Sequence, residues 1–398
     1  MTSRSWLALL LLCAPVTLAA QGSIKLPKSM AELEKTVKAD SNDHFAHYNV
    51  ALAYWQAKRW ADVDRELRTA LALEPRFAEA HLALAYLPLA RNKDLADAEV
   101  SKGKSQSKEL KEAIAQYNRE YRHAFLINPL VDMRIMAVND RTPDYFLMQQ
   151  VFGEIFAEYI SGLTDCEEGR YADCEARLTK VVVMIPRQLP PHNKVPDTAH
   201  WFRGIAAAHQ AHFDTASAEF AILIDRDAER VKEAEGKGLI RSPLRTNEYR
   251  YFRAVFERAA GHDQAAVDLM HTVLENDLGQ YIAHVRLADI YESRRMYDQA
   301  LEERRSAINV NPEDASLNID FGITLGKAGK FAEAEDALMT ATTALPRNAE
   351  AWFWLGLARE QLGKKAEARA AYERVIAVAP SRLQGRVAQA RQHLAALR

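Results

Sequence analysis

Residues 281–312 read YIAHVRLADIYESRRMYDQALEERRSAINVNP, residues 315–346 read ASLNIDFGITLGKAGKFAEAEDALMTATTALP, and residues 349–380 read AEAWFWLGLAREQLGKKAEARAAYERVIAVAP. The three stretches follow one another with a period of 34 residues. This period relates the prolines Pro312, Pro346 and Pro380 and the alanines Ala300, Ala334 and Ala368. A repeat of this length is typical of a tandem array of helix pairs, in which neighbouring pairs together bury one continuous apolar core.

A further set of positions keeps the same phase and indicates how the two helices of a pair approach each other. Small residues recur at Ala288, Gly322 and Gly356. A small side chain lets the first helix approach the second closely, which offsets the ~1 kcal/mol that a helical glycine costs relative to alanine. The prolines are expected to end each second helix, because proline lacks an amide hydrogen and disfavours a helical residue before it. Gly329 and Gly363 mark the turn inside each pair.

These residues resemble the tetratricopeptide repeat, with three adjacent copies in one register. Similar units end at Pro75 and near Pro186, and two degenerate units contain Gly204 and Ala254 at the small position. Residues 78–129 are interpreted as one more repeat with an inserted charged helix, and a disordered linker in its polar part is the alternative. The resemblance implies an all-α fold, a right-handed α-solenoid of antiparallel helix pairs with a C-terminal capping helix.

The predicted division of the chain follows from these units. We expect a signal peptide at 1–20, a lead segment at 21–43, a divergent repeat array at 44–230, a connector at 231–246, a second array at 247–380 and a capping helix at 381–398. Insertions in the first array are expected at 89–112, 130–145 and 187–196. The capping helix is predicted from the spacing of Leu383, Val387, Ala390 and Leu394, and binding to a membrane surface is the alternative for this helix.

The first 20 residues are typical of a secretory signal. Arg4 provides the positive charge of the N-terminal region, and an apolar run extends to Leu12. The small residues Ala19 and Ala20 lie at the expected cleavage site. Cleavage would change the formal net charge from −2 to −3. The run is too short for a comfortable membrane span, so we expect a periplasmic or secreted protein with no transmembrane segment in the mature chain. Cys13 leaves a lipid-anchored form as the alternative.

Cys166 and Cys174 remain after this cleavage and flank the predicted turn of one helix pair. An oxidising compartment permits a disulfide between them, provided that the two Cα atoms approach within about 7 Å. In the alternative, Cys174 only fills the small packing position of its helix. No Cys-x-x-Cys pair is present in the sequence, so we do not expect these cysteines to bind a metal.

Sequence motifs for catalysis are missing from the chain. Gly103-Lys104-Ser105 lacks the earlier glycine of a phosphate-binding loop. His209 and His212 can share a helical face, but no third ligand accompanies them at a recognisable spacing, so we interpret them as packing or surface residues. We therefore expect no enzyme activity, no cofactor and no metal. The 52 basic and 54 acidic residues balance, which gives no reason to expect nucleic acid as a partner.

Aromatic residues are frequent at positions that the resemblance places on the concave side of the array. The candidate anchors for a partner are Tyr48, Trp55, Tyr159, Trp201, Tyr251 and Phe353, and the same phase holds Leu82, Val285 and Ile319. Aromatic rings combine a large contact area with few rotatable bonds. The resemblance therefore implies a scaffold that binds a peptide or protein partner. Packing between repeats is the alternative for any one ring, and non-catalytic binding of a glycan or small molecule is the alternative function.

Overall fold

The computed structural model of the protein describes residues 28–91, 108–132, 153–190, 194–237 and 244–397. These residues form helices in tandem and no strand, which confirms the predicted all-α fold. The predicted signal peptide, with Cys13, lies outside the described residues. So do residues 92–107 and 133–152, which hold most of the first two predicted insertions.

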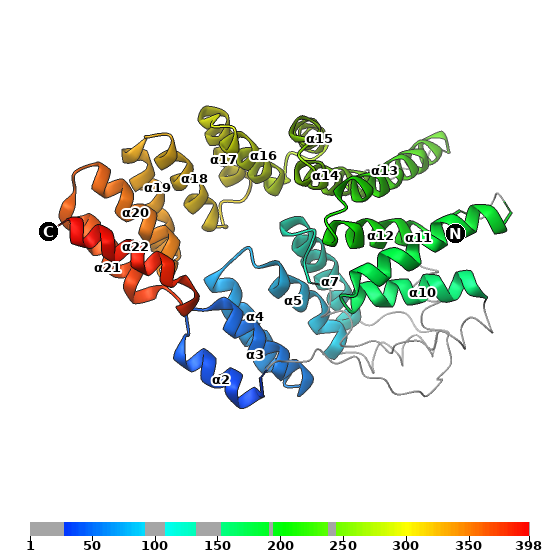
Figure 1. The fold of residues 1–398 in the computed structure, drawn as a ribbon, viewed down its shortest axis with the longest axis horizontal. Helices are drawn as coiled ribbons and strands as arrows, with labels where there is room; N and C mark the ends of the chain where they lie inside the picture. The colour runs from blue at the N-terminus through cyan, green and yellow to red at the C-terminus, as the bar shows by residue number, and fades with distance from the viewer. Residues whose placement is uncertain (1–27, 92–107, 133–152, 191–193, 238–243, 398) are drawn as a thin grey trace. The chain divides into compact units, whose positions relative to one another are not determined.

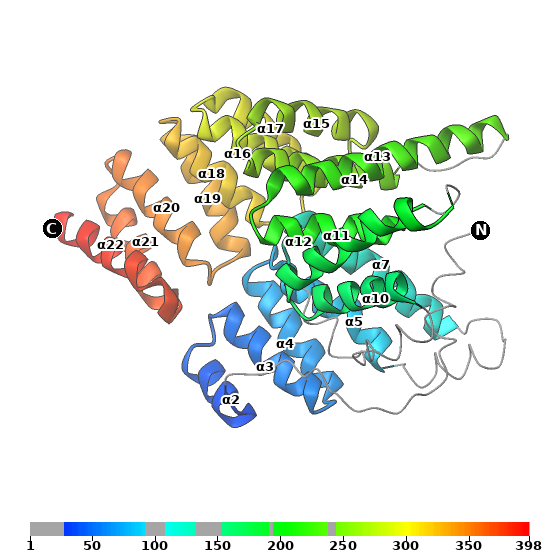
Figure 2. The ribbon, with the colours of Figure 1, turned by 45° about the vertical axis from the view of Figure 1, so that its right-hand side comes forward.

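The helices follow one another along the chain with short turns between most of them (Figure 1). They are α2 (Met30–Ala39), α3 (His44–Gln56), α4 (Trp60–Leu73), α5 (Ala78–Arg91), α7 (Lys108–Ile127), α10 (Glu154–Glu167), α11 (Tyr171–Gln188), α12 (Asp197–His209), α13 (Phe213–Gly236), α14 (Leu244–Ala259), α15 (Asp263–Asn276), α16 (Tyr281–Ser293), α17 (Tyr297–Val310), α18 (Ser316–Lys327), α19 (Phe331–Ala344), α20 (Ala349–Gln361), α21 (Lys365–Val378), the 3-10 helix η1 (Ser381–Leu383) and α22 (Gln384–Ala396). From α14 to α22, each α-helix packs against the next one in sequence, as Figure 2 also shows.

The helices belong to two compact units. Unit 1 contains Tyr54–Asp64 and Ala78–Gln210, and unit 2 contains Lys28–Ala53, Arg65–Phe77 and Ala211–Arg398. The first repeat, α3 with α4, thus contributes to both units. The first residues of the connector expected at 231–246 are helical, because α13 continues to Gly236. Residues 213–236 hold no proline and no glycine before the last position, so nothing in the sequence interrupts the helix.

The small residues of the 34-residue period lie where two helices touch. A Cβ atom on Gly322 would lie 2.5 Å from Cγ of Leu338, and one on Gly356 would lie 2.6 Å from Cε1 of Tyr372. Leu338 and Tyr372 are buried in the second helices of their pairs. These distances are shorter than atoms tolerate, so the predicted role of the small position in close helix packing is confirmed.

The prolines of the period end second helices as predicted. Pro312, Pro346 and Pro380 each follow the end of a helix by two residues. Pro186 differs, because it lies inside α11, which continues to Gln188. The amide of Leu189 still donates to the carbonyl of Ile185 at 3.0 Å, so the helical hydrogen-bond pattern continues past the proline ring. A proline in a last turn removes only one such bond, and buried Ile185 holds this turn in place.

The chain's last helix covers the end of the repeats, as predicted. In α22, Val387 and Ala390 are buried, and Ala390 packs in one cluster with Tyr372 of α21. Leu383 and Leu394 pack against the same cluster. The last repeat therefore does not expose its apolar core to water.

Candidate functional site

Half of the predicted aromatic anchors are core residues. Trp55, Tyr251 and Phe353 are 2%, 0% and 4% exposed. The indole of Trp55 packs edge-on against Trp60 at 5.7 Å, and the Tyr251 hydroxyl accepts a 3.3 Å hydrogen bond from Arg286. A partner cannot contact these three rings in this structure, so the structure assigns them to packing.

In other repeats the position of these anchors holds an aliphatic residue, and these aliphatic residues are also buried. Ile319 of α18 is buried against Ala341 of α19 and Ala351 of α20. Val285 is buried in the same way, in a cluster with Leu317, and Leu82 is fully buried. At Val285 and Ile319 the first helix thus faces the next repeat instead of solvent. For these two residues the structure shows the alternative of packing between repeats.

The C-terminal anchor Phe353 is covered by the capping helix. The guanidinium carbon of Arg386 on α22 lies 4.3 Å from the centre of the Phe353 ring, and Tyr372 packs against the ring at 5.9 Å. Arg386 is itself held by Glu350 at 2.7 Å. The predicted binding residue therefore forms part of the junction between the last repeat and α22.

Tyr48, Tyr159 and Trp201 remain partly exposed. Tyr48 packs edge-on against Phe77 at 5.3 Å in unit 2. Tyr159 and Trp201 lie in unit 1, on α10 and α12. The hydroxyl groups of Tyr159 and Thr198 are hydrogen-bonded, and Thr198 lies one turn before Trp201 on α12, so Tyr159 and Trp201 lie near each other.

We call Phe156, Tyr159, Thr198 and Trp201 the α10–α12 aromatic face. Phe156 lies one turn before Tyr159 and is 37% exposed. Burial raises the pKa of Tyr159, although the bond to Thr198 acts in the opposite direction. The phenol therefore stays neutral near pH 7 and offers a hydroxyl group together with its ring. The face combines accessible aromatic carbon with two hydroxyl groups.

A row of aromatic rings supports Trp201 from α5 and α7. Tyr121 lies 5.2 Å from Tyr117 and 4.8 Å from Phe125, and Phe125 lies 5.8 Å from Trp201. Tyr86 on α5 packs edge-on against Tyr117. This row was not among the site residues predicted from the sequence. The spacing of four residues between Tyr117, Tyr121 and Phe125 was the signal that could have predicted it.

The hydroxyl groups of this row remain protonated. Burial, and then the neighbouring tyrosines, raise the pKa of Tyr86 and of Tyr121 well above the ordinary value. Burial also raises the pKa of Tyr117. The carboxylate of Glu167 raises all three pKa values further. The row is therefore neutral and provides Trp201 with a rigid apolar support.

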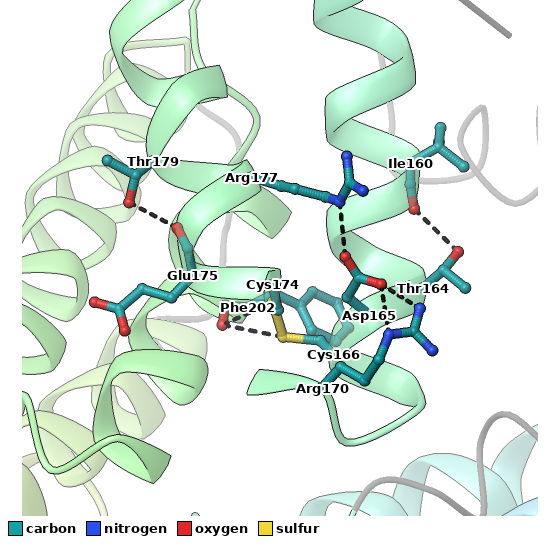
Figure 3. Close-up of a disulfide and its surroundings, with 10 residues drawn as sticks. All are labelled: Ile160, Thr164, Asp165, Cys166, Arg170, Cys174, Glu175, Arg177, Thr179 and Phe202. Carbon is teal, nitrogen blue, oxygen red and sulfur yellow. Dashed lines mark hydrogen bonds and ion pairs between the residues drawn. A yellow bond between two sulfur atoms is a disulfide. The ribbon is translucent and has the colours of Figure 1, made fainter. Parts of the chain in front are cut away.

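A disulfide joins the adjacent ends of α10 and α11 (Figure 3). Cys166 and Cys174 are bonded with their Cα atoms 5.1 Å apart, within the range that a disulfide spans. Both residues are fully buried. The Cys166 sulfur lies 3.5 Å from the carbonyl oxygen of Phe202, the residue that follows Trp201. The bridge thus lies directly behind the helix that carries Trp201.

Charged residues tie the same two helices together. The buried carboxylates of Glu158 and Asp165 both accept from Arg177, at 2.9 and 2.8 Å. Lys180 donates to Glu158 at 2.8 Å, and Arg170 donates to Asp165 from Nε at 3.0 Å (Figure 3). Because buried charges are costly unless paired, this network holds α10 in one position against α11. It therefore fixes Tyr159, which follows Glu158.

A second charged network lies in unit 2. Arg304 is 5% exposed and donates to Asp289 at 2.7 Å. Its guanidinium also lies 3.8 Å from the carboxylates of Glu292 and Asp320. This network was not predicted from the sequence. The signal in the sequence was a charged residue at a core position. Arg304 stands where the two following repeats have Leu338 and Tyr372.

The histidine pair noted in the sequence is not brought together with further ligands. His209 stacks on Tyr171 with ring centres 3.6 Å apart, and burial lowers its pKa to about 4. It is therefore a neutral packing residue. Within the described ranges, no group of three or more histidine, cysteine, aspartate or glutamate residues is arranged to hold a metal. Within the same ranges, no helix has the length and apolar character needed to cross a membrane.

Comparison with known proteins identifies the repeat type at the C-terminal end. Residues 319–382 match the family model described as tetratricopeptide repeat. The match begins within α18 and extends past α21, where the sequence period is strictest, so this part of the chain is similar to tetratricopeptide repeats. No curated protein matches the sequence.

Several solved structures resemble parts of the chain. MamA is 17% identical over 44% of this chain and 92% of its own, with a TM-score of 0.37. The C-terminal part of a tetratricopeptide repeat-containing protein of Cytophaga hutchinsonii is 12% identical over 55% of this chain and 78% of its own, with a TM-score of 0.44. A thermophilic tetratricopeptide repeat protein of Thermus thermophilus is 23% identical over 49% of this chain and 98% of its own, with a TM-score of 0.32. At these scores the similarities carry no argument about function.

Proposed function

We propose that the protein is a non-catalytic scaffold that binds a segment of a protein partner at the α10–α12 aromatic face. One observation carries the proposal: Tyr159 and Trp201 are partly exposed, while their neighbours Thr198 and Phe125 hold both rings in place. Rings that are already ordered lose little conformational freedom on binding, which favours affinity. Aromatic residues with this support are frequent energetic centres of protein interfaces.

We further propose that the protein acts in the periplasm or outside the cell. The signal-like sequence of residues 1–20 supports an export route. The bond between Cys166 and Cys174 supports the same location, because disulfides persist in oxidising compartments.

Glycan binding is less well supported than protein binding. It requires several exposed rings that stack on sugars, and it was considered on the basis of Trp201, Tyr159 and Tyr251. Tyr251 is fully buried, so only two of these rings remain accessible. Competition by free sugars distinguishes the two functions, because it would displace a glycan and leave a protein partner bound.

The proposed function is tested by photocrosslinking in the native compartment. A photoreactive residue at Phe156 should capture a protein, and the same residue at Leu278, which is 74% exposed in unit 2, should not capture it. Trp201→Ala should reduce the yield from position 156 by roughly tenfold or more, as expected for an interface centre. Thermal unfolding measured on the same variant controls for loss of structure.

Two results would contradict this function. The first is equal capture of the same protein from positions 156 and 278. The second is a Trp201→Ala variant that is stably folded and crosslinks as well as the parent chain. Loss of the crosslink on addition of free monosaccharides would instead support the glycan alternative.

A further inference from the structure

Residues near the start of the described chain contact residues near its end, and all of them belong to unit 2. Asp40 accepts hydrogen bonds from the amide and the hydroxyl of Ser381 at 2.6 and 2.7 Å. Asn42 donates to the carbonyl oxygen of Val378 at 3.0 Å. This carbonyl ends α21, where no helical amide remains to pair with it. A residue 336 positions earlier therefore caps the last repeat.

Two arginines complete this contact from the C-terminal repeats. Arg347, in the turn before α20, donates to the backbone carbonyl of Ser41 and to the side chain of Asn42. Arg382 of η1 donates to Asp43 at 3.2 Å, and its guanidinium carbon lies 5.3 Å from the ring centre of Phe45. Residues 40–45 are thus held by the ends of three C-terminal elements.

A second contact joins the first repeat to α18. Arg76 follows α4 and donates to Asp320 at 2.6 Å, and it lies 4.0 Å from Asp314. Burial opposes the charge of Arg76, but Asp320 and Asp314 outweigh it and raise the pKa of the guanidinium. Burial raises the pKa of the adjacent Glu74. Arg76 is therefore the cation that the first repeat contributes to this acidic cluster, in which Asp320 also lies near Arg304.

These contacts differ in kind from those between successive repeats. Ile319, Ala341 and Ala351 join neighbouring repeats through buried apolar surface. In contrast, residues 40–45 and Arg76 meet the C-terminal repeats through ion pairs and hydrogen bonds. The bonds of Asp40 and Asp43 are exposed, whereas the bond from Arg76 to Asp320 is partly buried. Exposed ion pairs contribute little net stability and weaken with salt. Such an interface can open while the repeats on both sides stay folded.

We propose that residues 40–45 and Arg76 form a reversible clasp, which closes the first repeat onto the C-terminal repeats and opens as one cooperative unit. In the closed state Arg76 pairs with Asp320 and lies beside Asp314. The clasp is thus a reversible contact built into unit 2. It is independent of the α10–α12 aromatic face, which belongs to unit 1.

Hydrogen exchange measured by mass spectrometry on the full chain tests the cooperativity of the clasp. The double variant Arg347→Ala/Arg382→Ala should speed exchange roughly tenfold at residues 40–45, and also at the distant contact, residues 74–77 and 314–320. Arg76→Gln should produce the reciprocal effect at residues 40–45 and 381–383. Arg391→Ala removes an exposed arginine of α22 that takes no part in the clasp, and it should change neither region.

Salt provides a test that needs no variant. Raising NaCl from about 0.05 M to about 0.5 M should speed exchange at both contacts of the parent chain together, because screening weakens ion pairs. In the double variant, exchange should already be fast at low salt. The proposal is overturned if each variant loosens only its own contact, if Arg391→Ala has the same effect, or if salt leaves both contacts of the parent chain unchanged.

Discussion

At the scale of single residues, a glycine on a first helix fits closely against a large side chain on the second helix of its pair. Gly322 faces Leu338, and Gly356 faces Tyr372. The sequence predicted that the small position serves helix approach, because the residues recur in phase. It could not predict which large residue would fill the space, since Arg304 replaces an apolar side chain at that phase.

Substituting Gly322 with alanine should destabilise the protein. The added Cβ would lie 2.5 Å from Leu338 Cγ, so the cost of overpacking, about 1–3 kcal/mol, should exceed the gain in helix propensity of about 1 kcal/mol. Gly326 is the matched control, because a Cβ there would meet its nearest neighbour, Trp354, at 3.9 Å. Gly326→Ala should therefore stabilise α18. Urea unfolding of the two variants measures both effects, and equal stabilisation by both would contradict the packing argument.

Protonation of His209 should make unfolding depend on pH. Burial lowers its pKa to about 4 in the folded chain, against an ordinary value near 6.5. The unfolded chain therefore binds more protons between these values, and the free energy of unfolding should fall as the pH drops from about 6.5 towards 4, by up to ~1.4 kcal/mol per pH unit. The contribution is fully present above pH ~6.5.

The variant His209→Phe isolates this effect. Phenylalanine keeps a ring against Tyr171 and removes the proton site, and Nε2 of His209 has no hydrogen-bond partner among the described residues that would be lost. Urea unfolding at pH 7, 6 and 5 should show a shallower pH dependence in this variant. His44 and His123, whose pKa values burial also lowers to about 4, contribute equally in both chains. Identical slopes for variant and parent would refute the assignment.

At the scale of helices, the order and the ends of the elements were largely predictable where the period is strict. The prolines after α17, α19 and α21 end these helices because each ring prevents the next helical hydrogen bond. Prediction was weaker where local composition is uniformly helical, as in α13, or where tertiary packing holds a proline inside a helix, as in α11. The solvent exposure of the aromatic anchors was not predictable, because the same face of a helix can be turned either to solvent or to the next repeat.

Reduction of the Cys166–Cys174 disulfide should destabilise unit 1. The bridge closes a loop with a sequence separation of 8, and the entropy of such a loop predicts a loss of about 2–3 kcal/mol. Hydrogen exchange in α10 and α11 should therefore rise in a thiol reductant, while α16 to α21 of unit 2 should not respond. The variant Cys166→Ser/Cys174→Ser should be insensitive to the reductant. An unchanged exchange rate in α10 after complete reduction would contradict this role.

At the scale of the whole molecule, the sequence predicted a tandem all-α array with a terminal cap, and it did not predict the contacts between the first repeat and the last ones. Periodicity reports what each repeat shares with its neighbours. Asp40, Asn42 and Arg76 act through contacts with residues that are hundreds of positions away, and no local pattern encodes such partners. The composition of unit 2, which combines residues 28–53 and 65–77 with residues 211–398, was hidden for the same reason.

Proteins of repeated units commonly change in length during evolution, because a duplicated unit adds to a stack without disturbing the others. The pairing of Asn42 with the end of α21 removes that freedom here. An extra copy of 34 residues inserted between α19 and α20 would move Val378 and Ser381 away from Asn42 and Asp40. We therefore expect proteins related to this chain to differ by substitution while keeping the number of repeats in unit 2.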